Sequence, residues 1–378
     1  MPLRARVLAA LVASALLLAA CSSSGSGPTD TTGTPPESST TVLEPSTTTS
    51  TTTPTPNLSL FIEPADQYAS IDQMIGGAQL SLDLTMYELA DPGVEDLLVA
   101  AHRRGVTVRV LLDHAGAGAM VNQHAYAQLT AQNVPVRWAP GSVVLHQKTL
   151  TADHSVSAIM TGNLTSTSYP TTRDFVVLDR SPTAVNAIET VFNSDWNGAS
   201  TTRGPTVAGL VWSPGARLAL IHLIDSAHRT VAVENEEMRA PTIISALKAA
   251  SHRGVLVTVT MTSSPLWKAA WSGLVRSGVE VATYPATPTA MYIHAKAIVV
   301  DNLTAFVGSQ NFSNASLAHN RELGLLTSDP GIVGPLSQTL AADFAGGTLF
   351  KGKLPPVSAT TPTTTPATGS TSTVAKAP

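Results

Sequence analysis

The chain has only one cysteine, Cys21, so it can form no internal disulfide and cannot build a zinc site from thiolates. Charged residues are also few, 13% of 378, and the formal net charge of −4 lacks the basic excess that a nucleic-acid backbone attracts. No apolar run reaches the roughly 20 residues of a membrane-spanning helix. These absences exclude a disulfide scaffold and a cysteine-based metal domain, and they disfavour dedicated nucleic-acid binding.

The amino-terminal end has the pattern of an export signal. Arg4 and Arg6 precede an almost purely apolar run, Val7 to Ala20, whose length is typical of a signal peptide. The sequence Leu18-Ala19-Ala20-Cys21 resembles a bacterial lipoprotein lipobox, which implies cleavage before Cys21 and lipidation of that residue. The alternative is an ordinary signal peptide in which Cys21 is incidental. We therefore expect an exported protein, lipid-anchored at the bacterial cell membrane or cell surface.

Composition then divides the chain into segments. Residues 22–58 and 356–378 are rich in Ser, Thr and Pro, a composition that cannot bury enough apolar surface to order itself. Because 43% of all residues are hydrophobic, the remainder is too apolar to be disordered. We expect a signal peptide at 1–20, a lipidated cysteine and disordered tether at 21–58, two folded lobes at 59–203 and 204–354, and a disordered tail at 355–378.

The expected core contains an internal repeat with an offset of 148 residues. Four positions at one spacing are hard to obtain by chance, so the repeat indicates two equal lobes derived from one unit. The repeated pairs are His146-Gln147-Lys148 with His294-Ala295-Lys296, Asp153 with Asp301, Asn163 with Asn311, and Asp174 with Glu322.

The segments before each motif have matching patterns. Alternating apolar residues predict strands, and a 3.6-residue period predicts the helix between them. These strand, helix and strand segments are 79–85, 94–104 and 106–112 in the first lobe, and 230–234, 242–253 and 255–261 in the second. Gly105 and Gly254 follow the two helices at the position C′. Each lobe has the pattern β-α-β-α-β, which predicts an α/β fold of two similar lobes with mixed or parallel sheets, related by a pseudo-twofold axis.

Both His-x-Lys triplets lie in runs with the pattern of a strand, 143–151 and 293–300. Side chains at i and i+2 of a strand share one face, so we expect the imidazole and the ammonium of each triplet to enter the same space. Asp153 and Asp301 follow their histidines by an odd number of residues, which sends them to the opposite face, where each strand should turn. We interpret these two aspartates as structural motif residues.

The other repeated residues complete a site that suits a phosphodiester. Asn163 and Asn311 follow strand-like segments and can supply amide donors, whereas Asp174 and Glu322 begin apolar runs in which a carboxylate can orient an imidazole. Ammonium and amide groups would hold the non-bridging oxygens, one histidine would attack phosphorus, and the other would protonate the leaving oxygen. This chemistry needs no metal ion and no cofactor.

With two copies of His-x-Lys-x4-Asp, each followed by an asparagine, the sequence resembles the phospholipase D superfamily over essentially the whole core. The resemblance implies a phosphohistidine intermediate, with His146 as nucleophile and His294 as general acid. Which acid serves which imidazole stays open. The other residues that it implies are Lys148, Lys296, Asn163 and Asn311 as phosphate ligands, Ser309 as a substrate-binding residue, and Asp174 and Glu322 as the acids that hold the histidines.

The first lobe departs from the pattern of the family. It has Met160-Thr161-Gly162-Asn163 where the second has Gly308-Ser309-Gln310-Asn311, and Thr172 stands where the second has Asn320. Every proposed catalytic atom type is still present. The departures therefore bear on geometry and substrate choice more than on activity.

Several functions are compatible with this site. The first is a phospholipase D-like enzyme that hydrolyses or transfers the phosphatidyl group of a glycerophospholipid, working as a monomer with both motifs in one site and anchored to a membrane by lipid. A cardiolipin synthase-like phosphatidyl transferase uses the same site.

A metal-independent nuclease or general phosphodiesterase is a further alternative, favoured if Arg103, Arg104, Arg109, Arg137 and Arg173 gather on one rim. The last is an inactive module that binds a phosphorylated polymer, against which the intact His and Lys pairs argue.

Overall fold

The computed structural model describes residues 57–141, 143–199 and 204–352. All of these residues belong to one compact unit. Cys21, the signal peptide, the expected tail and all of the expected tether except residues 57 and 58 lie outside the described residues. Within them, no helix is both long and apolar enough to cross a membrane.

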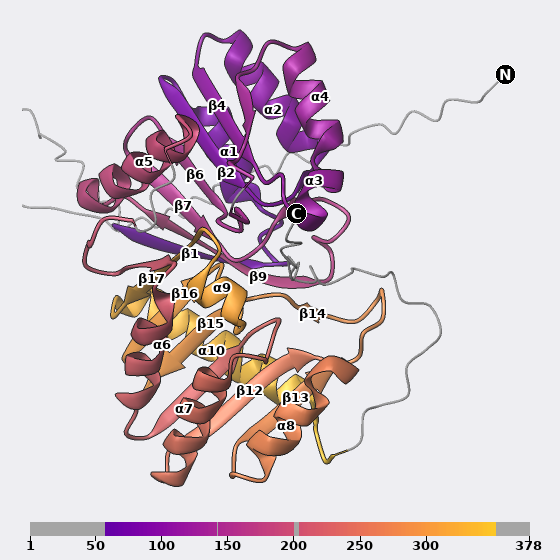
Figure 1. The fold of residues 1–378 in the computed structure, drawn as a ribbon, viewed down its shortest axis with the longest axis vertical. Coiled ribbons are helices and arrows are strands. Elements are labelled where there is room, and N and C mark those ends of the chain that lie inside the picture. Colours follow the sequence, from indigo (N-terminus) through magenta and orange to yellow (C-terminus); the bar gives the residue numbers. More distant parts are fainter. Residues whose placement is uncertain (1–56, 142, 200–203, 353–378) are drawn as a thin grey trace, which may run out of the picture. The chain divides into compact units, whose positions relative to one another are not determined.

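The first lobe is built on a mixed sheet. Its strands are β1 (Leu58–Glu63), β2 (Ser81–Met86), β4 (Thr107–Leu112), β5 (Val136–Trp138), β6 (Thr149–Ala152), β7 (Val156–Met160), β9 (Thr172–Asp179) and β14 (Tyr292–Ile293). They follow the order β1-β9-β7-β6-β2-β4-β5, and β14, which comes from the second half of the chain, pairs with β9 (Figure 1). The strands β2, β4 and β5 are mutually parallel, and β2, β6, β7, β9 and β1 pair antiparallel. A short separate ribbon joins β3 (Leu89–Ala90) to β8 (Leu164–Thr165).

Helices cover both faces of this sheet. They are α1 (Ala69–Gly77), α2 (Pro92–Arg103), α3 (Gly116–Val121), α4 (Gln123–Ala131) and α5 (Pro182–Trp196). The helices α1, α2 and α4 pack side by side, whereas α5 lies against β2, β6 and β7 (Figure 1). The start of α2 shows why this segment is helical. Asp91 caps the helix by accepting from the Gly93 and Val94 N–H groups, and Pro92 fills the first helical position, where no N–H is needed.

The second lobe repeats this plan. Its sheet has the order β10-β17-β16-β15-β11-β12-β13-β18, in which β11, β12 and β13 are parallel. Its strands are β10 (Leu210–Ser213), β11 (Thr230–Glu234), β12 (Leu256–Thr262), β13 (Glu280–Tyr284), β15 (Ala297–Val300), β16 (Thr304–Gly308), β17 (Glu322–Thr327) and β18 (Thr348–Leu349). Its helices are α6 (Ala216–Asp225), α7 (Pro241–His252), the 3₁₀ helix η1 (Pro265–Trp267), α8 (Lys268–Val275), α9 (Asn314–Ala318) and α10 (Pro330–Gly346). The helices α6, α7 and α8 lie in a row, and α10 packs against β11, β12, β13, β15 and β16 and against β1 of the first lobe (Figure 1).

The expected fold class, two similar α/β lobes with mixed sheets, is confirmed. The predicted helices 94–104 and 242–253 correspond to α2 and α7, and the glycines after them, Gly105 and Gly254, have φ of +93° and +89°. Glycine adopts this left-handed backbone without steric cost. The predicted pattern β-α-β-α-β omits part of each sheet, because antiparallel strands follow the third parallel strand in each lobe.

The position of the His-x-Lys triplets differs from the prediction. The strands β6 and β15 begin only at Thr149 and Ala297, one residue after each lysine. The backbone before each lysine pairs with the other lobe, whereas the carbonyls of Lys148 and Lys296 accept from Met160 and Gly308 of their own sheets. The His146 N–H donates to the Arg321 carbonyl at 2.9 Å, and the Ala295 N–H donates to the Arg173 carbonyl at 2.9 Å.

An apolar core joins the two lobes. It is made of buried side chains from both sheets and from α5 and α10. Members from the first lobe include Phe175 and Ile188, and members from the second include Val299 and Leu336. This shared core fixes the two triplets relative to each other, because the lobes cannot separate without exposing it to water.

Candidate active site

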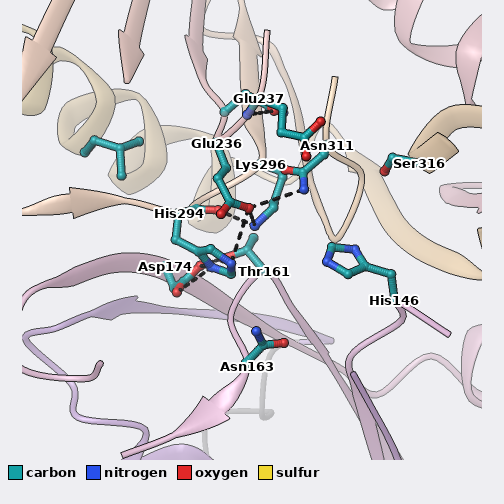
Figure 2. A network of polar contacts seen from close by, with 12 residues as sticks. His146, Thr161, Asn163, Asp174, Glu236, Glu237, His294, Lys296, Asn311 and Ser316 are labelled. Atoms are coloured by element: carbon teal, nitrogen blue, oxygen red, sulfur yellow. Dashed lines mark hydrogen bonds and ion pairs between the residues drawn. The ribbon is translucent and has the colours of Figure 1, made fainter. Parts of the chain in front are cut away.

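The two repeated histidines contribute to one polar site, and Figure 2 shows their rings together with Asp174, Glu236, Lys296, Asn163 and Asn311. Both imidazoles are largely buried. The sequence prediction that both motifs enter one site therefore agrees with the placement of these side chains.

Each histidine is held by a carboxylate from the other lobe. Nδ1 of His146 lies 2.9 Å from Oε2 of Glu322, and Nδ1 of His294 lies 3.0 Å from Oδ1 of Asp174. Because a hydrogen bond to a carboxylate places the proton on Nδ1, it leaves Nε2 of the neutral His146 ring with a free lone pair. The sequence left open which acid serves which imidazole. The structure pairs each histidine with the acid of the other lobe.

The electrostatic surroundings keep these acids charged. Burial would raise the pKa of Asp174, but the charge and hydrogen bond of His294 outweigh it and lower that pKa. Glu322 behaves alike, since burial is outweighed by His146 and the pKa is lowered. Burial is the largest influence on His146 itself and lowers its pKa, so this imidazole is neutral at physiological pH.

Further side chains to which the sequence assigned no role brace the two acids. Thr161 donates to Oδ1 of Asp174 at 2.5 Å, and Tyr68 lies 3.4 Å from its Oδ2. Gly162 makes this approach possible, because a Cβ there would lie 2.6 Å from Oδ2 of Asp174. In the second lobe, Ser316 and Asn320 donate to Oε1 of Glu322 at 2.5 and 3.0 Å. Of these, Thr161 and Asn320 lie in the motif segments, whereas nothing in the sequence distinguishes Tyr68 or Ser316.

The two lysines are fully buried and equivalently placed. Nζ of Lys148 donates to the His146 carbonyl at 2.8 Å, and Nζ of Lys296 donates to the His294 carbonyl. The Lys148 ammonium also lies over the Tyr87 ring, 5.1 Å from its centroid. Burial, and next the charge of Lys296, lower the pKa of Lys148 to about 7.

The two asparagines each face a glutamate of their own lobe. Nδ2 of Asn163 donates to Glu88 at 3.0 Å, and Nδ2 of Asn311 donates to Glu236 at 3.3 Å. These two glutamates are also 148 residues apart, so the repeat marks them as a pair in the sequence.

Ser309 does not take the role expected of it. Its hydroxyl is completely buried and exchanges hydrogen bonds with the backbone N–H and carbonyl of Leu323, at 3.2 and 3.3 Å. We therefore assign Ser309 to bracing the strand β17, which carries Glu322, in place of the substrate contact expected of it.

Asp153 and Asp301 lie in the turns that follow β6 and β15, with φ of 52° and 53°. Each carboxylate accepts from three successive backbone N–H groups, two of the loop before β2 or β11 and one of the first residue of that strand. For both, burial would raise the pKa, but these backbone donors outweigh it and lower the pKa. This geometry gives the two aspartates a structural role, tying a turn to a neighbouring strand.

Two buried ion pairs lock the lobes together beside the acids. Arg173 contacts Asp343 through Nε at 2.5 Å and Nη2 at 3.1 Å, and Arg321 contacts Asp195 at 2.9 and 3.0 Å. Both pairs cross the lobes, both are bidentate, and their members are again 148 residues apart. Since Arg173 and Arg321 directly precede Asp174 and Glu322, each ion pair holds the strand that delivers a carboxylate to the opposite histidine.

The described residues contain no group of three or more His, Cys, Asp and Glu side chains arranged to hold a metal ion. What the site offers is two carboxylate-bound imidazoles, two ammonium groups and two amides. This set can bind an oxyanion, form a bond from one imidazole and donate a proton from the other.

By its fold and site, the protein belongs to the class of two-lobed α/β proteins in which each lobe supplies one His-Lys pair to a common site. The family model for "Cardiolipin synthase, PLD-like domain" matches residues 71–196 and again residues 220–345, which together make up more than half of the chain. The chain therefore belongs to this family of phospholipase D-like domains, and both of its lobes are copies of the domain.

Similar proteins support this assignment. Cardiolipin synthase A of Pseudomonas aeruginosa (strain LESB58) is 31% identical over 136 residues, which are 34% of this chain and 27% of that protein. The mitochondrial cardiolipin hydrolase of Xenopus laevis is 29% identical over 122 residues, 32% of this chain and 56% of that protein. These alignments span only about a quarter to a half of the relatives' lengths. The phosphatidylserine synthase structure from Haemophilus influenzae Rd KW20 shares the fold, with a TM-score of 0.62 at 12% identity over 78% of this chain and 88% of that one.

Proposed function

We propose that this protein cleaves the phosphodiester of a glycerophospholipid through a phosphatidyl-histidine intermediate on His146. The observation that carries the proposal is the difference between the two carboxylate-bound imidazoles. His146 is neutral because burial lowers its pKa, so its Nε2 lone pair is available as a nucleophile. Nε2 of His294 instead lies 3.5 Å from the carboxylate of Glu236, so this atom faces a hydrogen-bond acceptor. His294 is therefore the general acid.

The reaction has two steps. Nε2 of His146 attacks phosphorus while the bond from phosphorus to the head-group oxygen breaks, and His294 gives its Nε2 proton to the departing alcohol. Water or a second alcohol then attacks phosphorus, His294 takes its proton, and the P–N bond to His146 breaks. Glu322 and Asp174 stabilise the positive charge that forms on each ring, as carboxylates do in other acid–His pairs.

The lysines and asparagines bind the phosphate during both steps. Lys148 and Lys296 bring two buried ammonium groups to the site, where charge on the non-bridging oxygens is stabilised far more than in water. Asn163 and Asn311 add amide donors, which bind Glu88 and Glu236 in the free protein and can bind phosphate oxygens in their place.

Phospholipid is the substrate that the comparisons favour. The matched family model and the two curated relatives are all named for cardiolipin, a phospholipid. The arginines whose gathering would favour a nuclease have separate protein partners instead. Arg103 donates to Gln132, Arg104 to the carbonyls of Ile75 and Gly76, Arg109 to Asp83, Arg137 to the Trp196 carbonyl, and Arg173 to Asp343.

The same family model supports a second candidate, phosphatidyl transfer to the hydroxyl group of another phospholipid. The first step is unchanged in that case, and the acceptor in the second step is an alcohol in place of water. We further propose that the protein acts at a membrane surface to which acylated Cys21 anchors it, which would bring the site close to its substrate.

The test incubates the full chain in EDTA with vesicles of phosphatidylcholine and phosphatidylglycerol and a little ethanol, followed by mass spectrometry. We expect phosphatidic acid, phosphatidylethanol or cardiolipin, none of which forms with His146→Ala. Phosphatidic acid alone indicates hydrolysis, and cardiolipin indicates transfer between lipids. No product from any lipid, together with cleavage of plasmid DNA, would contradict the proposal and support the nuclease.

A further inference from the structure

One carboxylate of the site, Glu236, makes contacts that the two-step reaction does not use. Oε2 of Glu236 lies 3.3 Å from Nζ of Lys296, 3.3 Å from Nδ2 of Asn311 and 3.5 Å from Nε2 of His294 (Figure 2). Its other oxygen accepts from the Tyr292 hydroxyl at 2.9 Å. Burial would raise the pKa of Glu236, but the charges of Lys296 and His294 outweigh it and lower that pKa, so the group is an anion.

Glu236 thus occupies the position where a phosphate oxygen must bind. Lys296, Asn311 and His294 are the three groups of the second lobe that would contact the substrate, and all three already face the same carboxylate oxygen. Two anions cannot share these donors, because like charges at such a distance in a buried site repel strongly. Substrate binding therefore has to displace the Glu236 carboxylate, and the displaced charge needs a new partner.

The direction of the reaction indicates what that partner is. The attacking and leaving atoms lie roughly in line in a phosphoryl transfer, so the leaving alcohol departs on the side opposite His146. That is the side of His294 and Glu236. The alcohol that leaves is the head group, so the head group lies beside Glu236, next to the ring of Tyr292, whose centroid is 6.2 Å from that of His294.

We propose that Glu236 is a specificity-determining residue that selects phosphodiesters whose leaving alcohol carries a cation. The phosphate of such a substrate is the anion that replaces Glu236 on Lys296 and Asn311. The cation of its head group then pairs with the displaced carboxylate. A head group without a cation leaves the carboxylate unpaired beside the phosphate. This inference rests on the proposed function and assigns its substrate class as phospholipids with an ammonium in the head group.

The pseudo-symmetric glutamate provides a matched control. Glu88 is the counterpart of Glu236 in the first lobe, and its carboxylate accepts from Asn163 at 3.0 Å. Its substitution removes the same charge from the same site, but not from the position next to Lys296, Asn311 and His294 that Glu236 takes. An effect of charge alone would appear in both variants, whereas head-group selection would appear only at Glu236.

The test compares full-length wild type, Glu236→Gln and Glu88→Gln on mixed vesicles of phosphatidylethanolamine and phosphatidylglycerol, with the released ethanolamine and glycerol measured together. We expect wild type to prefer phosphatidylethanolamine. Glu236→Gln should lower the ratio of the two kcat/KM values by about tenfold, mainly through loss on phosphatidylethanolamine, and Glu88→Gln should leave the ratio within about twofold.

A binding measurement separates specificity from loss of turnover. In a His146→Ala background, Glu236→Gln should weaken binding of glycerophosphoethanolamine and strengthen binding of glycerophosphoglycerol, as measured by calorimetry. A wild-type preference for phosphatidylglycerol, an equal ratio in Glu236→Gln and wild type, or the same shift in Glu88→Gln would overturn the inference while leaving the proposed function intact. Absence of wild-type activity on both lipids would instead contradict the proposed function, and this inference with it.

Discussion

Glu322, at the start of a strand of the second lobe, holds Nδ1 of His146 in the first lobe at 2.9 Å. The reciprocal pair, His294 with Asp174, crosses the same boundary in the opposite direction at 3.0 Å. Neither lobe therefore contains a histidine with its own carboxylate. The duplicated domain forms one site because each copy supplies what the other lacks.

Removing either carboxylate charge should reduce turnover without removing the substrate contacts. Asp174→Asn and Glu322→Gln should each lower kcat by roughly 10³–10⁴-fold with little change in KM, because the imidazole loses its tautomer and the counter-charge for its protonated form. Steady-state kinetics on a soluble phosphodiester measures both constants. Thr161→Val, which removes a donor to Asp174 and an acceptor for the Phe175 N–H but keeps the carboxylate, serves as the milder control. Wild-type kcat in Asp174→Asn would contradict the assigned pairing.

The interlobe ion pairs should contribute to stability. Arg173→Met should lower the free energy of unfolding by about 3–5 kcal/mol, because it leaves the buried carboxylate of Asp343 without its partner. The double variant Arg173→Met/Asp343→Leu should recover most of that loss, since no unpaired charge remains. Urea unfolding of the full chain measures both changes. Equal stability of the single variant and wild type would show that the pair does not hold the lobes together.

Activity should decline as pH rises through about 7. Lys148 has a pKa of about 7 in the folded protein, so above that value it loses the charge that binds the phosphate. On the acid side, the lowered pKa of His146 means that this nucleophile stays neutral to below the usual range of histidine. A profile of log kcat/KM against pH tests both limbs. Lys148→Arg, though less active, should lose the alkaline limb because arginine stays protonated. An unchanged alkaline limb in that variant would assign it to another group.

Chelation should not affect the reaction. Lys148 and Lys296 supply the positive charge that a metal ion provides in other phosphodiesterases, so the rate after dialysis against EDTA should stay within about twofold of the untreated rate. Adding back Mg²⁺, Ca²⁺ or Zn²⁺ is the control. Loss of activity in EDTA that one of these cations restores would contradict the mechanism.

The repeat made much of this site predictable. The offset of 148 residues singles out His146, Lys148 and Asn163 with their counterparts, and amphipathic periodicity predicts α2 and α7 to within two residues at each end. Both signals are local or follow from gene-level duplication, and so they can be read from the chain alone.

What the sequence could not give depends on contacts between the lobes. The repeat in the sequence looks the same whether Asp174 binds the histidine of its own lobe or that of the other lobe. Only the three-dimensional structure shows that the pairs cross the lobes. For the same reason the triplets were predicted inside strands, although their backbone pairs with Arg173 and Arg321 across the boundary. Ser309 has the hydroxyl of a ligand, but its place in β17's hydrogen bonds is a tertiary property.

The measurement that tests the central claim most directly uses His294→Ala with a p-nitrophenyl phosphodiester, whose leaving group needs no proton. Without His294 to activate water, the covalent intermediate should accumulate. The account predicts a burst of about one equivalent of nitrophenol and, by mass spectrometry of the digested protein, a phosphoryl adduct on His146. Under the same conditions His146→Ala should give neither. A burst from His146→Ala, or an adduct on any residue other than His146, would contradict the account.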